Sequence, residues 1–472
     1  MQNSKNVKLA KNIILMFLVY FMPKVFSFFL VPLYTSYLTT EEYGISDVII
    51  STASLLAPFI ALSIPSAVMR FTIENKDDRR PIWIAVQTYL IGMLIFLLGL
   101  IGTHYLFHVN ASYLLYIYII AGSSVLSDIN MSYTRGIEKM KLVTICGVGS
   151  SLVSILSNIL FIIVLKKGLY GFLISSAAGY FFNIILLISC NLKTISTPRS
   201  RDVTAYRTLR KDMLQFSVPT IFSGLSWWIV SSSDRYFVTL LCGASMNGIY
   251  SVAYKIPTIL QAIDNVFRQA WIYTLYDSYK TNEGREYIAK VYDVYNFLFC
   301  FGGAILIAIT CPLARILYSN DFYDAWRYVP LLIISVVLSS ASGLMGNFLS
   351  IYKKTKKAMV ISIIAALSNS ILNYILIIVT NDAMGAAIAT VFTFLISWIL
   401  NCYEGMKSSN VRIKWKKALF MYSVLCIQAV TIISIQNICV AGIGVLTIIA
   451  LNWNNILWAK SKWKNLIRKN KT

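Results

Sequence analysis

Charged residues are scarce in this 472-residue chain, because Asp, Glu, Lys and Arg together make up only 13% of it. A soluble domain carries roughly 25%. Acidic residues are scarcer than basic ones, with 20 Asp and Glu against 42 Lys and Arg. Hydrophobic residues account for 57% of the chain. This composition excludes an ordinary soluble protein and leaves little chain for an extramembrane domain.

Histidine is equally scarce, since only His104 and His108 occur, so histidine-based metal or acid/base chemistry is poorly supported. The eight cysteines are scattered without a C-x-x-C pair, and we interpret them as small core residues. We expect neither a metal nor another cofactor. The net charge of +22 lies in short loops rather than on a soluble basic face. Membrane lipids are therefore expected partners, and nucleic acid is not.

The apolar pattern predicts an all-α integral membrane protein with fourteen transmembrane helices. With the N-terminus inside, 34 of the 42 Lys and Arg residues lie on the cytoplasmic side, as the positive-inside rule requires. Both termini are therefore placed in the cytoplasm, and the first helix is interpreted as retained rather than as a cleaved signal peptide. The predicted spans are 10–38, 43–69, 81–103, 112–133, 142–165, 168–190, 213–240, 246–272, 288–311, 328–351, 358–379, 384–402, 418–435 and 438–458.

Two sequence matches indicate an internal repeat. Pro23 and Pro219 lie in similar segments of the first and seventh predicted helices, and Lys139–Val164 runs parallel to Lys354–Val379 without a gap. Repeats of six helices share one orientation, which suits a transporter whose two bundles rock around a central cavity. The predicted parts are an N-terminal bundle 1–190, a cytoplasmic linker 191–212, a C-terminal bundle 213–402, and residues 403–472 with two more helices and a basic tail.

Ionisable side chains inside the predicted helices are the candidates for function, because each costs a few kcal/mol at bilayer depth. Lys24, Arg235 and Lys255 predict a cationic cavity that accepts an anionic group such as phosphate. Asp264 and Arg268 are four residues apart and can pair, so a structural role stays as open as a substrate role.

Three other features of the predicted helices leave alternatives open. Asp234 and Arg235 could be a structural clasp near the surface, and Asp47 could simply be solvated at the outer interface. Trp227 and Trp228 lie midway along the seventh predicted helix and could stack on a sugar. Aromatic residues also line membrane interfaces for reasons unrelated to a substrate.

Several stretches resemble bacterial polysaccharide flippases. The matching stretches are Pro32–Gly44, Arg70-Phe71, and the most specific pair, Ser233–Phe237 with Gly248–Pro257. They are similar to Wzx-type O-antigen flippases, in the superfamily of the peptidoglycan lipid flippases and the MATE drug exporters. The resemblance implies a MATE-like fold and, as substrate, an oligosaccharide on undecaprenyl pyrophosphate. This lipid would move from the cytoplasmic to the periplasmic leaflet of the bacterial inner membrane, coupled to H⁺ or Na⁺.

The resemblance also implies roles for individual residues. The anionic headgroup would be held by Lys24, Arg70, Arg235, Lys255 and Arg268, and coupling would fall to Asp47, Asp234 or Asp264. Lys24 stands where several relatives have arginine, so the charge is kept while the bidentate fork is lost. A polysaccharide polymerase and a chain-length regulator are the implied protein partners.

Three other functions remain as alternatives. A multidrug cation antiporter of the same superfamily is disfavoured by the basic groups at depth. A membrane polymerase or glycosyltransferase would need a large outer loop or a carboxylate cluster, and the predicted outer loops are short. A scaffold for other membrane enzymes would have no reason to keep cations at the bilayer midplane.

Overall fold

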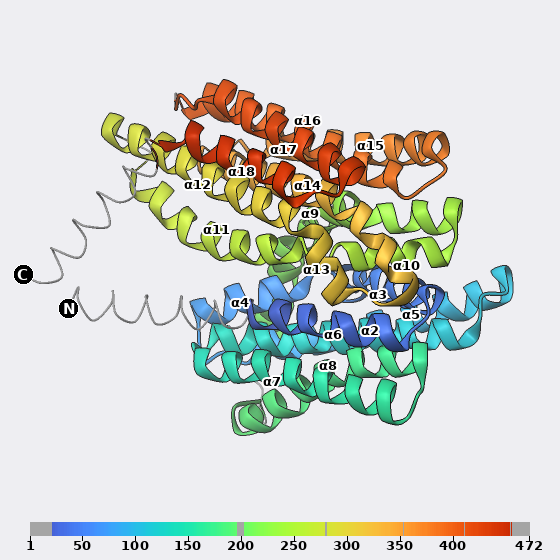
Figure 1. The fold of residues 1–472 in the computed structure, drawn as a ribbon. Coiled ribbons are helices and arrows are strands. Elements are labelled where there is room, and N and C mark those ends of the chain that lie inside the picture. The colour runs from blue at the N-terminus through green and yellow to red at the C-terminus, as the bar shows by residue number, and fades with distance from the viewer. Residues whose placement is uncertain are drawn as a thin grey trace, which may run out of the picture. The chain divides into compact units, whose positions relative to one another are not determined.

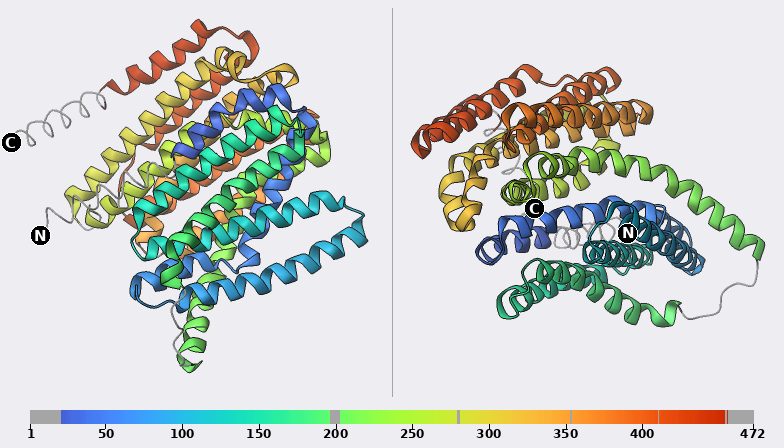
Figure 2. Two further views of the ribbon diagram at one scale, coloured as in Figure 1. Left: turned by 90° about the horizontal axis from the view of Figure 1, so that it is seen from below. Right: turned by 90° about the vertical axis from the view of Figure 1, so that its right-hand side faces the viewer.

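The computed structural model describes residues 21–195, 203–278, 281–352, 354–409, 411–453 and residue 455, and every element in them is a helix (Figure 1). The chain divides into two compact units, Met1–Ser232 and Ser233–Thr472. Within each unit the helices run roughly parallel or antiparallel to one another (Figure 2). Eleven helices of the described residues are long and apolar enough to cross a membrane. The predicted all-helical membrane fold is confirmed, whereas the count of fourteen spans stays a prediction.

The first unit is built around α6, which packs against α3, α4 and α8, while α7 lies along α8. Its helices are 21–29, α2 (Val31–Tyr37), α3 (Thr40–Ile60), α4 (Ile64–Glu74), α5 (Arg80–Phe107), α6 (Ala111–Gly136), α7 (Met140–Asn158) with a π-helical continuation (Ile159–Val164), α8 (Gly168–Ile195) and most of α9 (Val203–Cys242). Residues 196–202, in the predicted linker, and residues 10–20, in the first predicted span, lie outside the described part.

The second unit is built around α14, which packs against α16, α12 and α11, while α17 and α18 pack on α12. Its helices after α9 are α10 (Ala244–Ala253), α11 (Thr258–Ser278), α12 (Asn282–Ala308), α13 (Thr310–Leu317), a 3₁₀ helix (Asn320–Arg327), α14 (Val329–Ile351), α15 (Thr355–Thr380), α16 (Met384–Ser409), α17 (Trp415–Ile435) and α18 (Ile438–Leu451). The basic tail 456–472 lies outside the described part.

Two predicted spans are interrupted. The predicted helix 43–69 begins with a capping box, in which Thr39 and Glu42 satisfy each other's backbone N–H groups, and then breaks after Ile60. Leu62 and Ser63 take left-handed φ values of 49° and 52°, and the chain restarts as α4. The predicted helix 246–272 breaks in a turn at residues 254–257, because Pro257 disfavours helical conformation in the residue before it.

The internal repeat recurs in the packing. An added Cβ on Gly171 would meet the backbone of Phe161 at 2.9 Å, and one on Gly385 would meet the backbone of Leu376 at 2.4 Å. Phe161 and Leu376 occupy equivalent places in the two matched segments. In each unit, therefore, the backbone at the start of one helix lies in close contact with the backbone at the end of the preceding helix. Only glycine, which has no Cβ, permits this approach.

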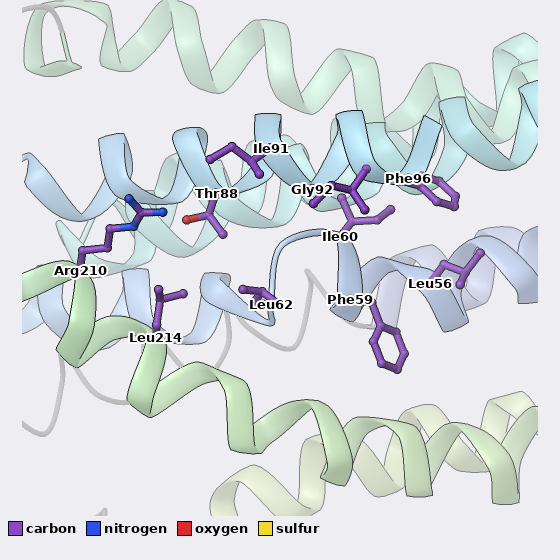
Figure 3. Close-up of a pocket in the computed structure, with 11 residues that line it drawn as sticks. Leu56, Phe59, Ile60, Leu62, Thr88, Ile91, Gly92, Phe96, Arg210 and Leu214 are labelled. Atoms are coloured by element: carbon purple, nitrogen blue, oxygen red, sulfur yellow. The ribbon is translucent and has the colours of Figure 1, made fainter. Parts of the chain in front are cut away.

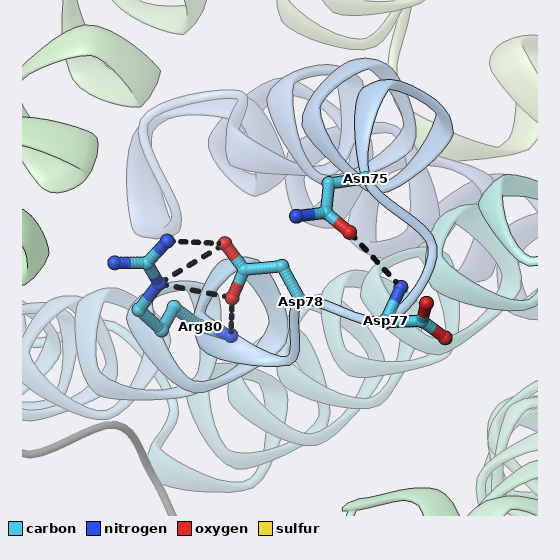
Figure 4. A network of polar contacts seen from close by, with 4 residues as sticks. All are labelled: Asn75, Asp77, Asp78 and Arg80. Atoms are coloured by element: carbon cyan, nitrogen blue, oxygen red, sulfur yellow. Dashed lines mark hydrogen bonds and ion pairs between the residues drawn. The ribbon is translucent and has the colours of Figure 1, made fainter.

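The loop between α4 and α5 is held by short-range polar contacts (Figure 4). The Asp78 carboxylate accepts a hydrogen bond from the Arg80 guanidinium at 2.7 Å. The side-chain oxygen of Asn75 accepts one from the backbone N–H of Asp77 at 3.2 Å. Burial alone raises the pKa of Asp78, but the hydrogen bonds and charge of Arg80 outweigh it and hold that pKa below its usual value. The pair fixes the start of α5, where Pro81 occupies the first turn.

Candidate functional site

Asp234 lies at the centre of a buried polar cluster in the second unit. Its carboxylate is 1% exposed and accepts hydrogen bonds from the hydroxyls of Tyr250 at 2.9 Å and Tyr254 at 2.6 Å. The backbone N–H of Arg235 adds a third at 3.0 Å. A carboxylate buried in this way is expensive unless such donors surround it. The site can therefore hold a negative charge and would respond to a proton or a cation that neutralises it.

The cluster extends through side chains of α15 and α16. Ser233 donates to the Asn369 carbonyl oxygen at 3.1 Å, and Asn369 donates in turn to Thr393 at 3.4 Å. Asn373, one turn along α15, donates to Asn369 at 3.0 Å. The side-chain oxygen of Asn373 is buried and has no hydrogen-bond partner among the described residues. This network, which begins at the residue before Asp234, therefore ends on a buried oxygen that can still accept a hydrogen bond.

Arg235 and Lys255, two of the predicted headgroup cations, flank this cluster. The Arg235 guanidinium lies 5.5 Å from the ring centre of Tyr254, which is the range of a cation–π contact. Lys255 is half-buried and lies in the turn between α10 and α11 rather than in a helix. Its carbonyl accepts the Thr258 hydroxyl at 2.6 Å. Lys255 therefore lies on non-helical backbone. Membrane proteins tolerate such backbone at bilayer depth only where it is buried in protein or lines a water-filled cavity.

Arg268 and Asp264 form the ion pair that their spacing permitted. The Arg268 Nε donates to both Asp264 carboxylate oxygens at 2.8 and 2.7 Å, and its Nη2 and the Tyr295 hydroxyl donate to the same carboxylate. Asp264 is 1% exposed. The arginine lies directly against Gly343, where a Cβ would meet its Nη1 at 2.0 Å. This guanidinium is thus occupied by a protein carboxylate.

The remaining predicted ionic residues belong to the first unit. Arg70 is half exposed, pairs with Glu74 at 3.2 Å, and lies 4.6 Å from the ring centre of Phe216. Asp47 is half-buried in α3, and Lys24 is exposed on the helix 21–29. Their roles stay predictions.

Half of the residues that line a cavity of 470 Å³ in the first unit carry a hydroxyl group. It opens at the break between α3 and α4 and is bounded by α6, α8 and α9. Its polar lining consists of Ser54, Ser63, Ser66, Ser124, Asp128, Tyr180 and Thr220. The hydroxyls of Ser54, Ser66, Ser124 and Thr220 donate to backbone carbonyls of their own helices. Their lone pairs, together with Asp128, therefore make the cavity rich in acceptors.

Tyr180 also lines a second cavity of 400 Å³. This cavity is bounded by Pro23, beside Lys24, and by the amide of Asn183, whose buried side-chain oxygen has no partner among the described residues. Its remaining polar lining is Ser150, Ser151, Ser154 and Ser176. Both volumes fall in the range of small-molecule sites, about 300–1,000 Å³.

The two predicted stacking residues differ in their surroundings. The indole N–H of Trp228 donates to Ser54 at 3.1 Å, which places this ring at the edge of the larger cavity. Trp227 is 67% exposed. Of the two, Trp228 alone contacts a residue that lines the cavity, which favours it as the stacking residue.

Sequence reasoning missed most of these polar partners. Tyr250 and Tyr254 are four residues apart, and residues at this spacing share one helix face. The spacing could therefore have predicted that the two hydroxyls lie close together. Asn369 and Thr393 carry no signal of their own, because their role depends on a packing that brings α15 and α16 to α9.

The fold is shared with the solved structures of a flippase and of transporters. The structure is similar to the lipid II flippase MurJ in an inward closed conformation, with a TM-score of 0.66 at 15% identity, covering 95% of this chain and 98% of that one. It is also similar to an outward-facing multidrug resistance MATE family transporter of the MOP superfamily, with a TM-score of 0.61 at 16% identity, covering 85% of this chain and 96% of that one. At these identities the likeness shows the fold.

The chain belongs to the polysaccharide biosynthesis protein family, whose model matches residues 9–274. An uncharacterised membrane protein of Methanocaldococcus jannaschii is 24% identical over 233 residues, which is 45% of this chain. The match spans about half the length of that relative, 54% of it. The family membership and the eleven long apolar helices of the described residues make this a multi-pass membrane protein of a polysaccharide biosynthesis family.

Proposed function

We propose that the protein flips undecaprenyl-pyrophosphate-linked oligosaccharides from the cytoplasmic to the periplasmic leaflet of the bacterial inner membrane by alternating access. Both termini would lie in the cytoplasm, and a polymerase and chain-length regulator would use the flipped product. The observation that carries the proposal is the hydroxyl-lined pair of cavities in the first unit, with Trp228 at the edge of one. Hydroxyls, one carboxylate and an aromatic face match the many donors and the apolar ring face of a sugar.

The pyrophosphate would contact basic side chains outside these cavities. Lys24, Arg235 and Lys255 are the favoured cations, and Arg70 stays a candidate at the end of α4. Arg268 is the weakest of the five, because Asp264 already occupies its guanidinium. A second anion would have to displace a buried carboxylate, which would then be left without its counter-ion.

Asp234 is the favoured coupling carboxylate. Asp264 is neutralised by an arginine, and Asp47 is only half-buried. Asp234 instead accepts hydrogen bonds from two tyrosines that can also serve other acceptors. Binding of H⁺ or Na⁺ would remove the cost of its buried charge and change how strongly α10 is held to α9. Such a charge-dependent contact is what coupling requires.

One observation favours a second function, the export of cationic drugs. Asp128 is the one charged side chain among the described residues that line the larger cavity, and no described residue donates a hydrogen bond to it. A carboxylate that lines a cavity would suit an organic cation as well as a sugar.

Replacement of Asp128 separates the two functions. In a strain deleted for the gene, surface polysaccharide and accumulated lipid-linked oligosaccharide would be measured after complementation, alongside efflux of ethidium. If the substrate is a sugar, Asp128→Asn keeps hydrogen bonding and retains most polysaccharide, while Asp128→Leu loses it. If the substrate is a cation, both variants lose efflux equally because the charge is gone. Normal polysaccharide in the deletion strain itself would refute the flippase proposal.

A further inference from the structure

A third cavity in the first unit has the opposite chemistry. It is a crevice of 300 Å³ between α3, the break that follows α3, α5 and α9, and its lining is almost wholly apolar (Figure 3). The main contributors are Leu56, Phe59, Ile60, Ile91, Ile95 and Phe96. None of the predicted site residues lines it. It is therefore a feature separate from the hydroxyl-lined cavities and from the Asp234 cluster.

One charged group stands at one end of this crevice. Arg210 of α9 lies beside Leu214, while Phe96 and Leu56 lie at the opposite end (Figure 3). Arg210 is exposed and forms no hydrogen bond or ion pair with any residue that the structure describes. The crevice thus has a cationic end and an apolar end, the arrangement that an anionic amphiphile would match.

The length of the crevice along α5 agrees with the thickness of one leaflet of a bilayer. Thr88 and Phe96 of α5 both line it and are eight residues apart, so at about 1.5 Å per residue the lined stretch is roughly 12 Å long. One leaflet contributes about half of a hydrocarbon core about 30 Å thick. The Tyr206 hydroxyl donates to Gln87 at 2.7 Å and holds α9 against α5 near the charged end.

The crevice is also open to the surroundings of the protein. Ile91 and Ile95 of α5 are 51% and 64% exposed, and Phe59 of α3 is 46% exposed. These three side chains form the rim of the crevice. The neighbouring leucines of α5 are exposed as well, as expected for a surface that contacts lipid. A lipid chain could enter sideways without any rearrangement of the helices.

We propose that this crevice binds one anionic phospholipid, with a chain between α3 and α5 and the phosphate on Arg210. The charge of Arg210 selects an anionic headgroup over a zwitterionic one, and the apolar walls hold the acyl chain. The site would tie α9 to α3 and α5 through a lipid. This makes the annular lipid composition a determinant of the stability of the first unit.

The test uses the full chain purified in detergent, titrated with phosphatidylglycerol or phosphatidylethanolamine and examined by native mass spectrometry. The wild type should bind one phosphatidylglycerol about fivefold more tightly than phosphatidylethanolamine, which corresponds to about 1 kcal/mol for one basic side chain at a lipid surface. Arg210→Gln should abolish this preference. Arg207→Gln, one turn earlier on the same helix and not part of the lining, should keep it.

A second pair of variants tests the chain-binding half. Ile91→Trp should fill the rim and reduce binding of both lipids at least fivefold, whereas Leu90→Trp, 59% exposed and outside the lining, should leave it unchanged. Both substitutions are at exposed positions, so folding is preserved in each. Equal loss in the two arginine variants, or equal binding in the two tryptophan variants, would overturn the proposal and indicate nonspecific lipid adhesion.

Discussion

Removing the charge of Asp264 should destabilise the second unit more than any exposed ion pair can. Asp264 is 1% exposed, and its carboxylate is held by the Arg268 guanidinium and by the Tyr295 hydroxyl. Breaking a buried pair by removing one partner costs about 3–5 kcal/mol. Because the Arg268 side chain is 33% exposed, water can partly solvate it, and we expect the lower end, about 3 kcal/mol.

The experiment is a double-mutant cycle on the purified protein in detergent, followed by thermal unfolding. Asp264→Asn alone should lower the melting temperature by about 6–12 °C, since 1 kcal/mol shifts it by roughly 2–4 °C in a domain of 150–250 residues. Arg268→Met alone should cost at least as much, because it leaves the 1% exposed carboxylate without its counter-ion and with only its tyrosine donor. The double variant should lose no more than Asp264→Asn, giving a coupling energy of about 3 kcal/mol.

A matched control lies in the first unit. Arg70 and Glu74 have the same spacing along a helix, but their side chains are 53% and 55% exposed. The same cycle there, with Glu74→Gln and Arg70→Met, should give only about 0.3–0.5 kcal/mol. Additive losses at Asp264 and Arg268, or equal coupling at the two pairs, would refute the argument that burial decides the difference.

Three further outcomes follow from the same contacts. Lys24→Ala should abolish surface polysaccharide while membrane insertion persists, and Lys24→Arg should retain it; normal polysaccharide in Lys24→Ala would contradict the cationic-headgroup proposal. Gly385→Leu should lower the thermal stability by about 2 kcal/mol or more, because its side chain would collide with the Leu376 backbone, whereas Gly99→Leu, with open space around it, should be neutral. Asp78→Asn should be less stable than the wild type at pH 7, by about 0.5–1 kcal/mol. Folding holds the pKa of Asp78 below its usual value, so this difference is complete above the unfolded-state pKa of about 3.9 and is lost as the pH falls through the folded-state pKa. A difference that persists below both values would point to packing instead of charge.

Much of the fold could be predicted from the hydrophobic pattern, and the exceptions have physical causes. Long apolar runs such as those in α5 and α6 contain little that competes with a helix, so their spans were predicted to within a few residues. The break after Ile60 was missed because Leu62 and Ser63 adopt left-handed backbone angles without a glycine. The flanking Pro58 and Pro65 were the signal available.

The candidate site was less predictable than the fold. The sequence identified Asp234 and Arg235, and it left open the pairing of Asp264 with Arg268, which lies within one helix. Partners contributed by other helices could not be found, since the contact of Ser233 with Asn369 joins residues far apart in the chain. The hydroxyl-lined cavity was invisible for the same reason, because single serines in apolar helices resemble ordinary packing residues.

The course of α9 has a mechanical consequence. The division between the two units falls inside this one unbroken helix, after Ser232, rather than in a loop. At about 1.5 Å per residue its 40 residues form a rod about 60 Å long. If the two units rotate against each other, as the proposed alternating access requires, α9 must bend or twist. Pro219 is the position where it bends most easily, because proline lacks a backbone N–H. The free-energy cost of bending α9 would then be part of the barrier between the two states of the transport cycle.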